Sequence, residues 1–411
     1  MKNEPIFSTE IQIGLVFKML KNENAASFMK KKQVNNLHSS ELVLDVPILI
    51  GNQIYRYLPF DELHPLAINR IMPVIDLARS VGWLDDSNYL ESSIASVEML
   101  TRYHDQDYVE AVVSAEYNGS LPAALSERYN IGRGGNSFFS KIFTRPAIAS
   151  GASIRAGRLL ANSDKGVLYS LGGGNHHAKK NNASGFCIFN DPVLGILAML
   201  DNGLKKVLYV DLDAHHGDGV QEAFQNDDRV LTISIHETNR WPFTGGLYDR
   251  GSGNVRNLPV PKGLNDTEMR VLITEGVIPV GENFEPEAVV IQAGSDALLD
   301  DPQSQLRLSN LALWEAVEDL TKLSHRILVL GGGGYNPWAT VRAWSGIWGL
   351  LNKQNLDFEL PLKPVGILRD LKWNHSKGRN IPYGWTARLA DSPNIGSVRE
   401  EIRDIVYEIK R

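Results

Sequence analysis

Five short segments of aliphatic and β-branched residues each end in Gly, Asp or His, and this pattern constrains the fold more than any other feature of the chain. Most of them are separated by stretches with the apolar spacing of helices, such as "DPVLGILAML". Alternating strands and helices predict an α/β fold with a central, mainly parallel sheet and helices on both faces. We expect the active site at the carboxyl ends of the strands. The segments are "GVLYSLGGGNHH" (166–177), "KVLYVDLDAHH" (206–216), "RVLTISIHE" (229–237), "AVVIQAGSD" (288–296) and "RILVLGGGGY" (326–335).

Composition narrows the class of protein. The 411 residues are 43% hydrophobic and 22% charged, as in a folded globular chain, and the net charge of -6 speaks against direct nucleic-acid binding. The single cysteine, Cys187, excludes an intramolecular disulfide and favours a reducing compartment. "IQIGLVFKML" is too short for a membrane span and is broken by Lys18, so we expect no membrane association and no classical signal peptide. We expect a cytoplasmic protein, with a nuclear location or non-classical export as alternatives; the sequence sets no oligomeric state.

The chain divides into two parts by composition. Residues 1–44 are rich in Lys and Asn, as in "KMLKNENAASFMKKKQVNN", and we interpret them as an N-terminal extension with some helix. The extension is either a solvated surface arm or a segment that binds a partner. Residues 45–411 contain no Ser/Gly linker and no internal repeat, so we expect one catalytic domain that ends in a C-terminal helical segment.

Three residues at two strand ends have the chemistry of a metal site. Asp213 and His215 are separated by one residue, so on an extended segment their side chains point the same way. Asp296 follows another strand and can supply a third ligand. Two carboxylates and an imidazole suit Zn²⁺ with positions left for water and substrate. Asp211 is better placed behind these ligands. The plainer alternative is that the acids cap a loop or bind a structural cation.

The adjacent His176 and His177 predict proton transfer rather than metal binding. Adjacent histidines rarely bind one metal ion together because their side chains diverge, whereas one can accept a proton and the other offer one. Each imidazole needs an orienting carboxylate, for which Asp211 and Asp218 are candidates. As an isolated pair, two adjacent histidines are equally compatible with a structural role.

The glycine run before Tyr335 predicts that this phenol approaches the site. In "GGGGYNPW" the four glycines permit a tight fold, and a phenol there can donate a hydrogen bond to a polarised carbonyl oxygen. The alternative is a core tyrosine with a satisfied hydroxyl. Phe186 is a candidate for lining an access path, or a plain core residue.

Several long motifs together resemble one family, the zinc-dependent histone deacetylases, and most of all its class I enzymes and the bacterial acetoin-utilisation-type deacetylases. The resemblance runs in order through about residues 45 to 350. It implies the arginase–deacetylase type of α/β fold. The motifs are "HPLAIN" with Arg70, "HHAKKNNASGFCIFND", "VLYVDLDAHHGDGVQEAF", "RVLTISIHE", "IQAGSDALLDDP" and "GGGGYNPW".

The resemblance also implies roles for individual residues. One Zn²⁺ would be bound by Asp213, His215 and Asp296. The catalytic residues would be His176 paired with Asp211, His177 paired with Asp218, and Tyr335, which polarises the acetyl carbonyl. An acyl-lysine tunnel would be lined by Gly185, Phe186, Phe243 and Gly333. A structural K⁺ would be held by Asp211, Asp213, His215 and Ser234.

Two departures from related patterns refine this expectation. The arginase branch places further acidic ligands for a second manganese ion where this chain has Gly217 and Leu298, so a ureohydrolase is disfavoured. Class I deacetylases have an acid at the rim of the site, where "YNIGRGGNSFF" places Gly134. The loop "HETNRWPFTGG" also departs from the usual pattern. The rim should therefore recognise substrate differently.

The expected function is a zinc-dependent lysine deacetylase that hydrolyses the acetyl (acyl) amide of N6-acetyl-lysine in proteins such as histones. Its partner would be an acetylated protein or peptide. One alternative is an amidohydrolase for an acetylpolyamine or another small molecule, against which Arg133 and the absence of an acid in "NIGRGGNS" argue. The other is a catalytically silent module that binds acyl-lysine, against which the complete set of reactive residues argues.

Overall fold

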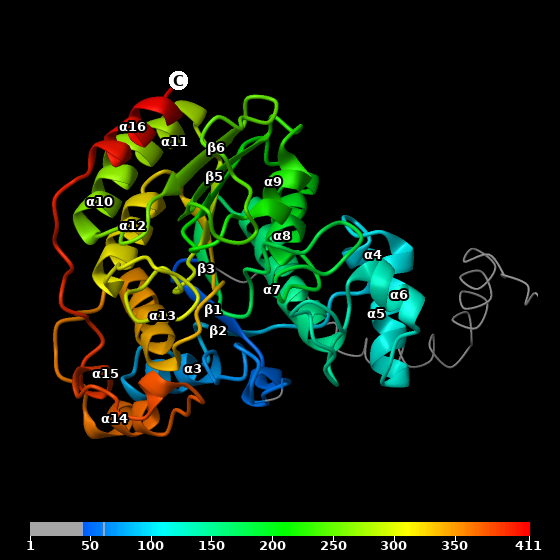
Figure 1. Ribbon diagram of the computed structural model, residues 1–411, viewed down its shortest axis with the longest axis horizontal. Coiled ribbons are helices and arrows are strands. Elements are labelled where there is room, and N and C mark those ends of the chain that lie inside the picture. The colour runs from blue at the N-terminus through cyan, green and yellow to red at the C-terminus, as the bar shows by residue number, and fades with distance from the viewer. Residues whose placement is uncertain (1–43, 61) are drawn as a thin grey trace, which may run out of the picture.

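The computed structural model describes residues 44–60 and 62–411 (Figure 1). The described residues form one eight-stranded sheet in the order β2-β1-β3-β8-β7-β4-β5-β6, and every neighbouring pair is parallel. The predicted α/β fold is therefore confirmed. The strands are β1 (Ile48–Gly51), β2 (Tyr89–Glu91), β3 (Gly166–Ser170), β4 (Val207–Asp211), β5 (Val230–Glu237), β6 (Val255–Val260), β7 (Ala288–Gln292) and β8 (Arg326–Leu330).

Helices cover both faces of the sheet, which explains why its strands are apolar at nearly every position. Tyr209 and Val290 face one layer, while their neighbours Val210 and Ile291 face the other. The first layer contains α7 (Thr144–Ala161), α8 (Asp191–Asp201) and α9 (Asp218–Phe224). The second contains α3 (Met72–Ser80), α10 (Asp266–Val271), α12 (Asn310–Thr321), α13 (Pro337–Leu351), α14 (Leu362–Arg369), α15 (Gly384–Ala387) and α16 (Glu400–Ile409).

A third hydrophobic cluster supports the loop between β3 and α8. It is formed by the short helices at the right of Figure 1 together with parts of α7 and α8. The hydroxyl of Tyr108 donates to the carbonyl of Ile188 at 2.7 Å, and the backbone N–H of Asn190 donates to Nε2 of His104 at 2.9 Å. These contacts fix the segment that carries the adjacent histidines. The helices are α4 (Val97–Leu100), α5 (Gln106–Asn118) and α6 (Ala123–Tyr129).

Asparagine caps fix where two of the loops become helices. Asn190 accepts a hydrogen bond from the N–H of Val193 at the start of α8, and Asn336 accepts two from the first turn of α13. A proline follows within the first turn of each helix, where its missing N–H costs nothing. The cap at Asn336 stands directly after Tyr335, so it holds the end of the glycine-rich loop.

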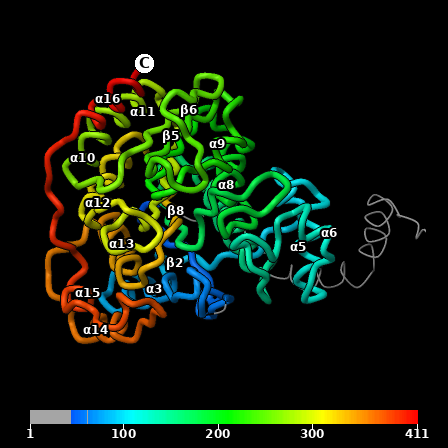
Figure 2. The backbone as a smooth tube through the Cα atoms, in the orientation of Figure 1, coloured from blue at the N-terminus to red at the C-terminus, as the bar shows by residue number. Residues whose placement is uncertain are grey.

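The predicted C-terminal helical segment runs from α14 and α15 at one end of the molecule to α16 at the other, as the tube in Figure 2 shows. Arg399 joins it to α10 through an ion pair of 2.6 Å with the buried Glu268. Three shorter elements are the 3₁₀ helices at Gln53–Arg56 and Ser376–Gly378 and the π-helix at Leu272–Val277, which continues into α11 (Ile278–Phe284).

The predicted N-terminal extension lies outside the described residues except for Leu44. This residue is buried in the core and packs against Gly166. Among the helices of the described chain, none has the length and apolar character needed to cross a membrane.

Candidate active site

The reactive residues converge at the carboxyl ends of four neighbouring strands. His176 and His177 follow β3, Asp213 and His215 follow β4, Asp296 follows β7, and Tyr335 follows β8. In the sheet these strands stand in the order β3-β8-β7-β4. The parallel arrangement therefore brings together residues that lie up to 159 positions apart in the chain, as the strand pattern predicted.

Asp213, His215 and Asp296 form a cluster that can hold a metal ion. Each offers one ligand atom, these atoms lie within 4.8 Å of one another, and all three residues are buried. Nδ1 of His215 lies 2.9 Å from Oδ2 of Asp296 and 3.2 Å from Oδ1 of Asp213. Two carboxylates facing one imidazole nitrogen form a donor set that suits a divalent ion such as Zn²⁺.

The electrostatics of this cluster indicate a missing positive charge. Burial, and then the nearby charge of Asp213, raise the pKa of Asp296 to about 6. Burial opposes the protonation of His215, but its contacts with Asp213 and Asp296 outweigh burial and raise its pKa to about 10. Asp301 adds another buried acid, and burial followed by the charge of Asp296 raises its pKa well above the usual value. A bound cation would relieve this repulsion.

Glycines let the backbone pass directly against the ligand carboxylates. A Cβ on Gly294 would overlap the carboxylate of Asp213, and a Cβ on Gly333 would overlap that of Asp296. The N–H of Gly333 also donates to Oδ2 of Asp213 at 2.7 Å. Gly333, which was expected to line the tunnel, thus also orients a predicted metal ligand.

The adjacent histidines pair with the two expected carboxylates. Nδ1 of His176 lies 2.7 Å from Oδ2 of Asp211, and Nδ1 of His177 lies 2.7 Å from Oδ1 of Asp218. A cation lies behind the second of these pairs, since Nζ of Lys179 lies 2.6 Å from Oδ2 of Asp218. Because each Nδ1 is held by a carboxylate, each Nε2 is available for proton transfer.

The two histidines have opposite electrostatic environments. Burial, and then the positive charge of His176, lower the pKa of His177 to about 3 despite the contact with Asp218. Burial also disfavours the charged form of His176, but the charges of Asp211 and Asp213 outweigh it and raise the pKa to about 9. At neutral pH His176 is therefore charged, while His177 is neutral and can accept a proton.

Tyr335 is buried beside the metal cluster. Its backbone N–H donates to Oδ2 of Asp301 at 2.6 Å, and its ring meets that of Phe186 edge-on at 6.1 Å. Burial, and then the charge of Asp296, raise the pKa of the phenol well above 10. The hydroxyl therefore keeps its proton and is a hydrogen-bond donor. Asp301 lies in the quoted motif "IQAGSDALLDDP", but its role depends on a contact across 34 residues.

The predicted tunnel residue Phe243 needs a correction. Its side chain is 74% exposed, and the ring that packs on His177 is instead that of Trp241, with centroids 4.6 Å apart. A Cβ on Gly185 would collide with both His177 and Trp241. Trp241 stands in the same loop, but the sequence offered two aromatics there with no rule for choosing between them.

Phe186 provides a second aromatic wall. Its φ of 68° is rare for a residue with a side chain, and it is held by a 2.8 Å hydrogen bond from its N–H to Oδ1 of Asn136. Its ring also contacts His64 edge-on at 5.0 Å. Strained backbone at such a position is typical of functional sites.

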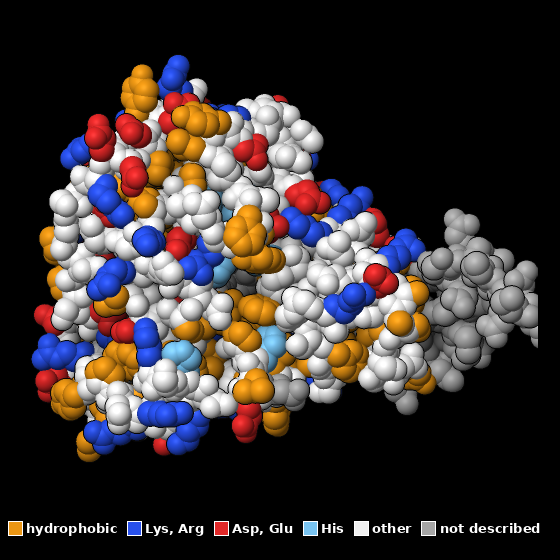
Figure 3. Space-filling model, in the orientation of Figure 1, with side chains coloured by type: hydrophobic (Ala, Val, Ile, Leu, Met, Phe, Trp, Pro, Cys, Tyr) orange, Lys and Arg blue, Asp and Glu red, His pale blue; other side chains and the backbone are white. Residues whose placement is uncertain are grey.

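The rim has the character expected from the sequence. Gly134 has a φ of 53° and offers no carboxylate, and the neighbouring Arg133 lies 3.6 Å from Glu127. Figure 3 shows histidine side chains between hydrophobic ones near the middle of this face. The large exposed hydrophobic residues include Phe138, Trp241, Phe243 and Tyr248.

The residues expected to hold a monovalent cation lie beneath the metal cluster. Asp211 and Ser234 are direct partners in the pairing of β4 with β5. Oδ1 of Asp211 accepts a hydrogen bond from the N–H of Asp213 at 3.1 Å, and the hydroxyl of Ser234 lies 3.0 Å from Nδ1 of His236.

Comparisons with known proteins agree with this geometry. The family model "Histone deacetylase domain" matches residues 64–351. The chain is 31% identical to the acetoin utilization protein AcuC of Bacillus subtilis, over 82% of this chain and 89% of that protein. It is 34% identical to human histone deacetylase 1 over 76% of this chain.

The chain spans less than two thirds of two of these relatives. It covers 64% of human histone deacetylase 1 and 61% of the putative histone deacetylase 2 of Caenorhabditis elegans, to which it is 35% identical over 74% of its own length. The crystal structure of a histone deacetylase homolog from Aquifex aeolicus superposes with a TM-score of 0.84, at 33% identity, and covers 89% of this chain and 100% of its own. A related structure contains the compound SAHA. With a matching domain model, relatives above 30% identity and a shared fold, this chain belongs to the histone deacetylase family.

Proposed function

We propose that the protein is a zinc-dependent lysine deacetylase that hydrolyses the amide of acyl-lysine, most readily acetyl-lysine, in a protein or peptide. The observation that carries the proposal is the convergence of a buried Asp-His-Asp cluster, two His–Asp pairs and a protonated tyrosine at one edge of the sheet. The complete set also argues against a silent binding module.

Asp213, His215 and Asp296 would hold the zinc ion. When bound, the ion would lower the pKa of water and polarise the acyl carbonyl. His177, kept neutral, accepts the proton of the attacking water at Nε2 and later delivers it to the departing lysine amine. The charged His176 stabilises the negative charge that develops on the acyl oxygen, to which Tyr335 donates a hydrogen bond.

Two features position the substrate in this proposal. The rings of Phe186 and Trp241 would enclose the alkyl chain of the acyl-lysine, since they approach the histidines and Tyr335 from different loops. A K⁺ ion beside Asp211 and Ser234 would neutralise part of the acidic charge beneath the cluster.

The rim favours a lysine side chain over a cationic polyamine. A site for a polycation would be expected to carry acids at its entrance, whereas the stretch around Gly134 carries Arg133. The exposed aromatic residues suit the aliphatic part of a peptide substrate. Without a carboxylate to hold the substrate backbone, we expect little preference for peptide sequence.

A substrate panel tests this proposal. We expect kcat/KM values that differ little among acetyl-lysine peptides and at least a tenfold lower value for acetylspermidine, a discrimination that needs only about 1.4 kcal/mol. Loss of activity with a chelator and recovery with Zn²⁺ would support the choice of metal. A preference for acetylspermidine would replace the lysine assignment with the polyamine alternative.

A further inference from the structure

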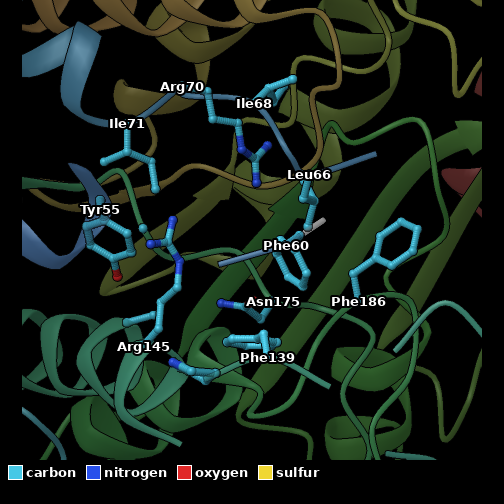
Figure 4. A pocket seen from close by; sticks show the side chains of 13 residues that line it. Tyr55, Phe60, Leu66, Ile68, Arg70, Ile71, Phe139, Arg145, Asn175 and Phe186 are labelled. Atoms are coloured by element: carbon cyan, nitrogen blue, oxygen red, sulfur yellow. The ribbon is translucent and has the colours of Figure 1, made fainter. Parts of the chain in front are cut away.

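A partly open cavity of about 80 Å³ lies next to the active site. In Figure 4 it extends from Phe186 and Asn175 toward Tyr55 and Arg145, with Arg70 along its wall. This volume has room for several water-sized groups. Asn175 directly precedes the histidine pair in the chain, so the cavity begins where the proton-transfer residues are.

Two guanidinium groups border this cavity, and neither is neutralised by an ion pair with a carboxylate in the part of the chain that is described. Nη1 of Arg70 donates to the carbonyls of Gly332 at 2.7 Å and Gly334 at 3.1 Å. Nη1 of Arg145 donates to the carbonyls of Ile54 at 3.2 Å and Tyr57 at 3.1 Å. A guanidinium has five N–H donors, so both groups keep donors for a ligand.

The surroundings distinguish the two arginines. Arg70 senses acids of the metal cluster, including Asp296 and Asp213, which counteract the effect of burial on its pKa. Among the described residues no acid affects Arg145 in this way: burial lowers its pKa to about 10, Tyr55 opposes this, and the charge of Arg70 adds to it. It still carries its proton at neutral pH. Arg145 is half-buried, and no carboxylate of the described residues pairs with it, so its positive charge is open to an added anion.

The position of the cavity says which anion fits. Arg70 holds the carbonyls on either side of Gly333, the glycine packed against the metal-ligand carboxylates. The cavity therefore adjoins the glycine loop that contacts the metal ligands, and Phe186 forms part of its wall. The carbonyl of a bound acyl group would lie at the metal cluster, and the remainder of that group would point toward the arginines.

From this arrangement we infer that the site accepts acyl groups that end in a carboxylate, such as malonyl or succinyl, and that Arg145 binds this carboxylate. The inference rests on the proposed deacylase function. In the reaction the oxygen of water forms a bond to the acyl carbon, the C–N bond breaks, and the lysine amine leaves with a proton. The products are the unmodified lysine side chain of the peptide and a dicarboxylate.

The test compares peptides that carry acetyl-, butyryl- and succinyl-lysine. Butyryl has the length of the succinyl stem without its charge, so the ratio of kcat/KM for succinyl to butyryl isolates the carboxylate. We expect Arg145→Gln to lower this ratio about tenfold or more, the size expected for a lost hydrogen bond to a charged group. Arg145→Lys should restore part of the ratio because it keeps the charge.

Arg155→Gln is the matched control. Arg155 lies on the same helix, and its guanidinium donates to the carbonyl of Glu91 at 3.4 Å away from the cavity. The control should leave the ratio unchanged, and thermal melting of all variants verifies their folding.

Calorimetry with free succinate and neutral succinamide gives a readout besides turnover. We expect succinate alone to bind, and Arg145→Gln to weaken it. Hydrolysis of acetyl-lysine without hydrolysis of succinyl-lysine overturns the inference and leaves the proposed function intact. Arg145-dependent succinate binding without succinyl-lysine hydrolysis also overturns it, because the cavity would then be a site for free anions. If no acyl-lysine peptide is hydrolysed, the proposed function fails and the inference falls with it.

Discussion

The metal cluster is buried and the neighbouring cavity is bordered by two half-buried arginines, so the two regions carry charges of opposite sign. Asp213, Asp296 and Asp301 crowd one side, while Arg70 and Arg145 border the other, and the glycine loop that precedes Tyr335 separates them. Folding leaves like charges together only where another contact compensates. The sign of the unpaired charge therefore indicates which class of ligand each region would bind, a metal cation on one side and, under the inference above, an anion on the other.

The largest expected effect comes from removing one acid of the metal cluster. Asp213→Ala should lose the metal ion and reduce activity to background, because the two remaining ligands hold a divalent ion poorly. Metal analysis and a deacetylation assay measure both. Asp300→Ala is the control, since Asp300 is partly exposed and pairs with Lys377 at 3.5 Å. A variant that keeps one tightly bound ion per chain would remove Asp213 from the ligand set, and two tightly bound ions in the wild type would contradict a single-ion centre.

The next largest effect separates the two histidines on the acidic side. His177→Ala should lower kcat by about 10²–10⁴, the usual range for a general base, while His176→Ala should lower it less. The reason is that the pKa of His177 is lowered, which leaves a free Nε2, whereas that of His176 is raised. Profiles of kcat against pH for both variants provide the measurement. Equal losses would mean that the two environments do not set separate roles.

A variant of Tyr335 tests whether the residue that follows the glycine loop, between the metal cluster and the cavity, takes part in the reaction. Tyr335→Phe should keep the fold and the metal while kcat falls by about 10²–10³, the usual loss of one oxyanion donor. The phenol is protonated because its pKa is raised by burial and by Asp296, so it has a proton to donate. Stopped assays with matched metal content measure the effect. Near-normal kcat would show that the hydroxyl does not contact the reacting oxygen.

The smallest effect concerns His104, a buried imidazole whose two ring nitrogens both have hydrogen-bond partners. Nε2 of His104 accepts from Asn190 and Nδ1 contacts the carbonyl of Lys180, and burial lowers its pKa from 6.5 to about 4. The unfolded chain takes up this proton below about pH 6.5 and the folded chain only near pH 4, so stability is lost as pH falls between these values.

His104→Gln removes the titrating group. Between pH 7 and pH 4.5 the variant should lose about 2 kcal/mol less of its unfolding free energy than the wild type, as urea denaturation would measure. Equal losses in the two proteins would show that His104 gains its proton without unfolding. Such a result would mean that a buried group with complete hydrogen bonding, like His104, does not resist a change of charge.

The sequence predicted the parts of this molecule that depend on local pattern. Apolar runs ending in Asp, His or Gly located the strand ends, and the spacing of Asp213 and His215 placed both on one side of their segment. Three strands were not singled out: β1 has only four residues, β2 has only three, and β6 contains polar positions.

Residues whose roles depend on distant contacts were harder to predict. Trp241 reaches His177 across 64 positions, and Asp301 receives the N–H of Tyr335 from 34 positions away. Arg145 lies in the first turn of α7, where its sequence position gives no sign that a cavity faces it. Such contacts depend on how loops fold over the sheet, and neither periodicity nor spacing encodes that.

The pairing of β4 with β7 has a consequence for how this protein is made. His215 and Asp296 come from these two strands and are separated by 81 positions, and β5 and β6 are synthesised between them but take their places on the far side of β4. No short stretch of a growing chain contains the complete ligand set, so metal capture must wait until the centre of the sheet has closed. Only chains in which β4 and β7 have paired would then bind the metal ion. Chains arrested before that step would contain no metal, and metal analysis would distinguish them from folded chains.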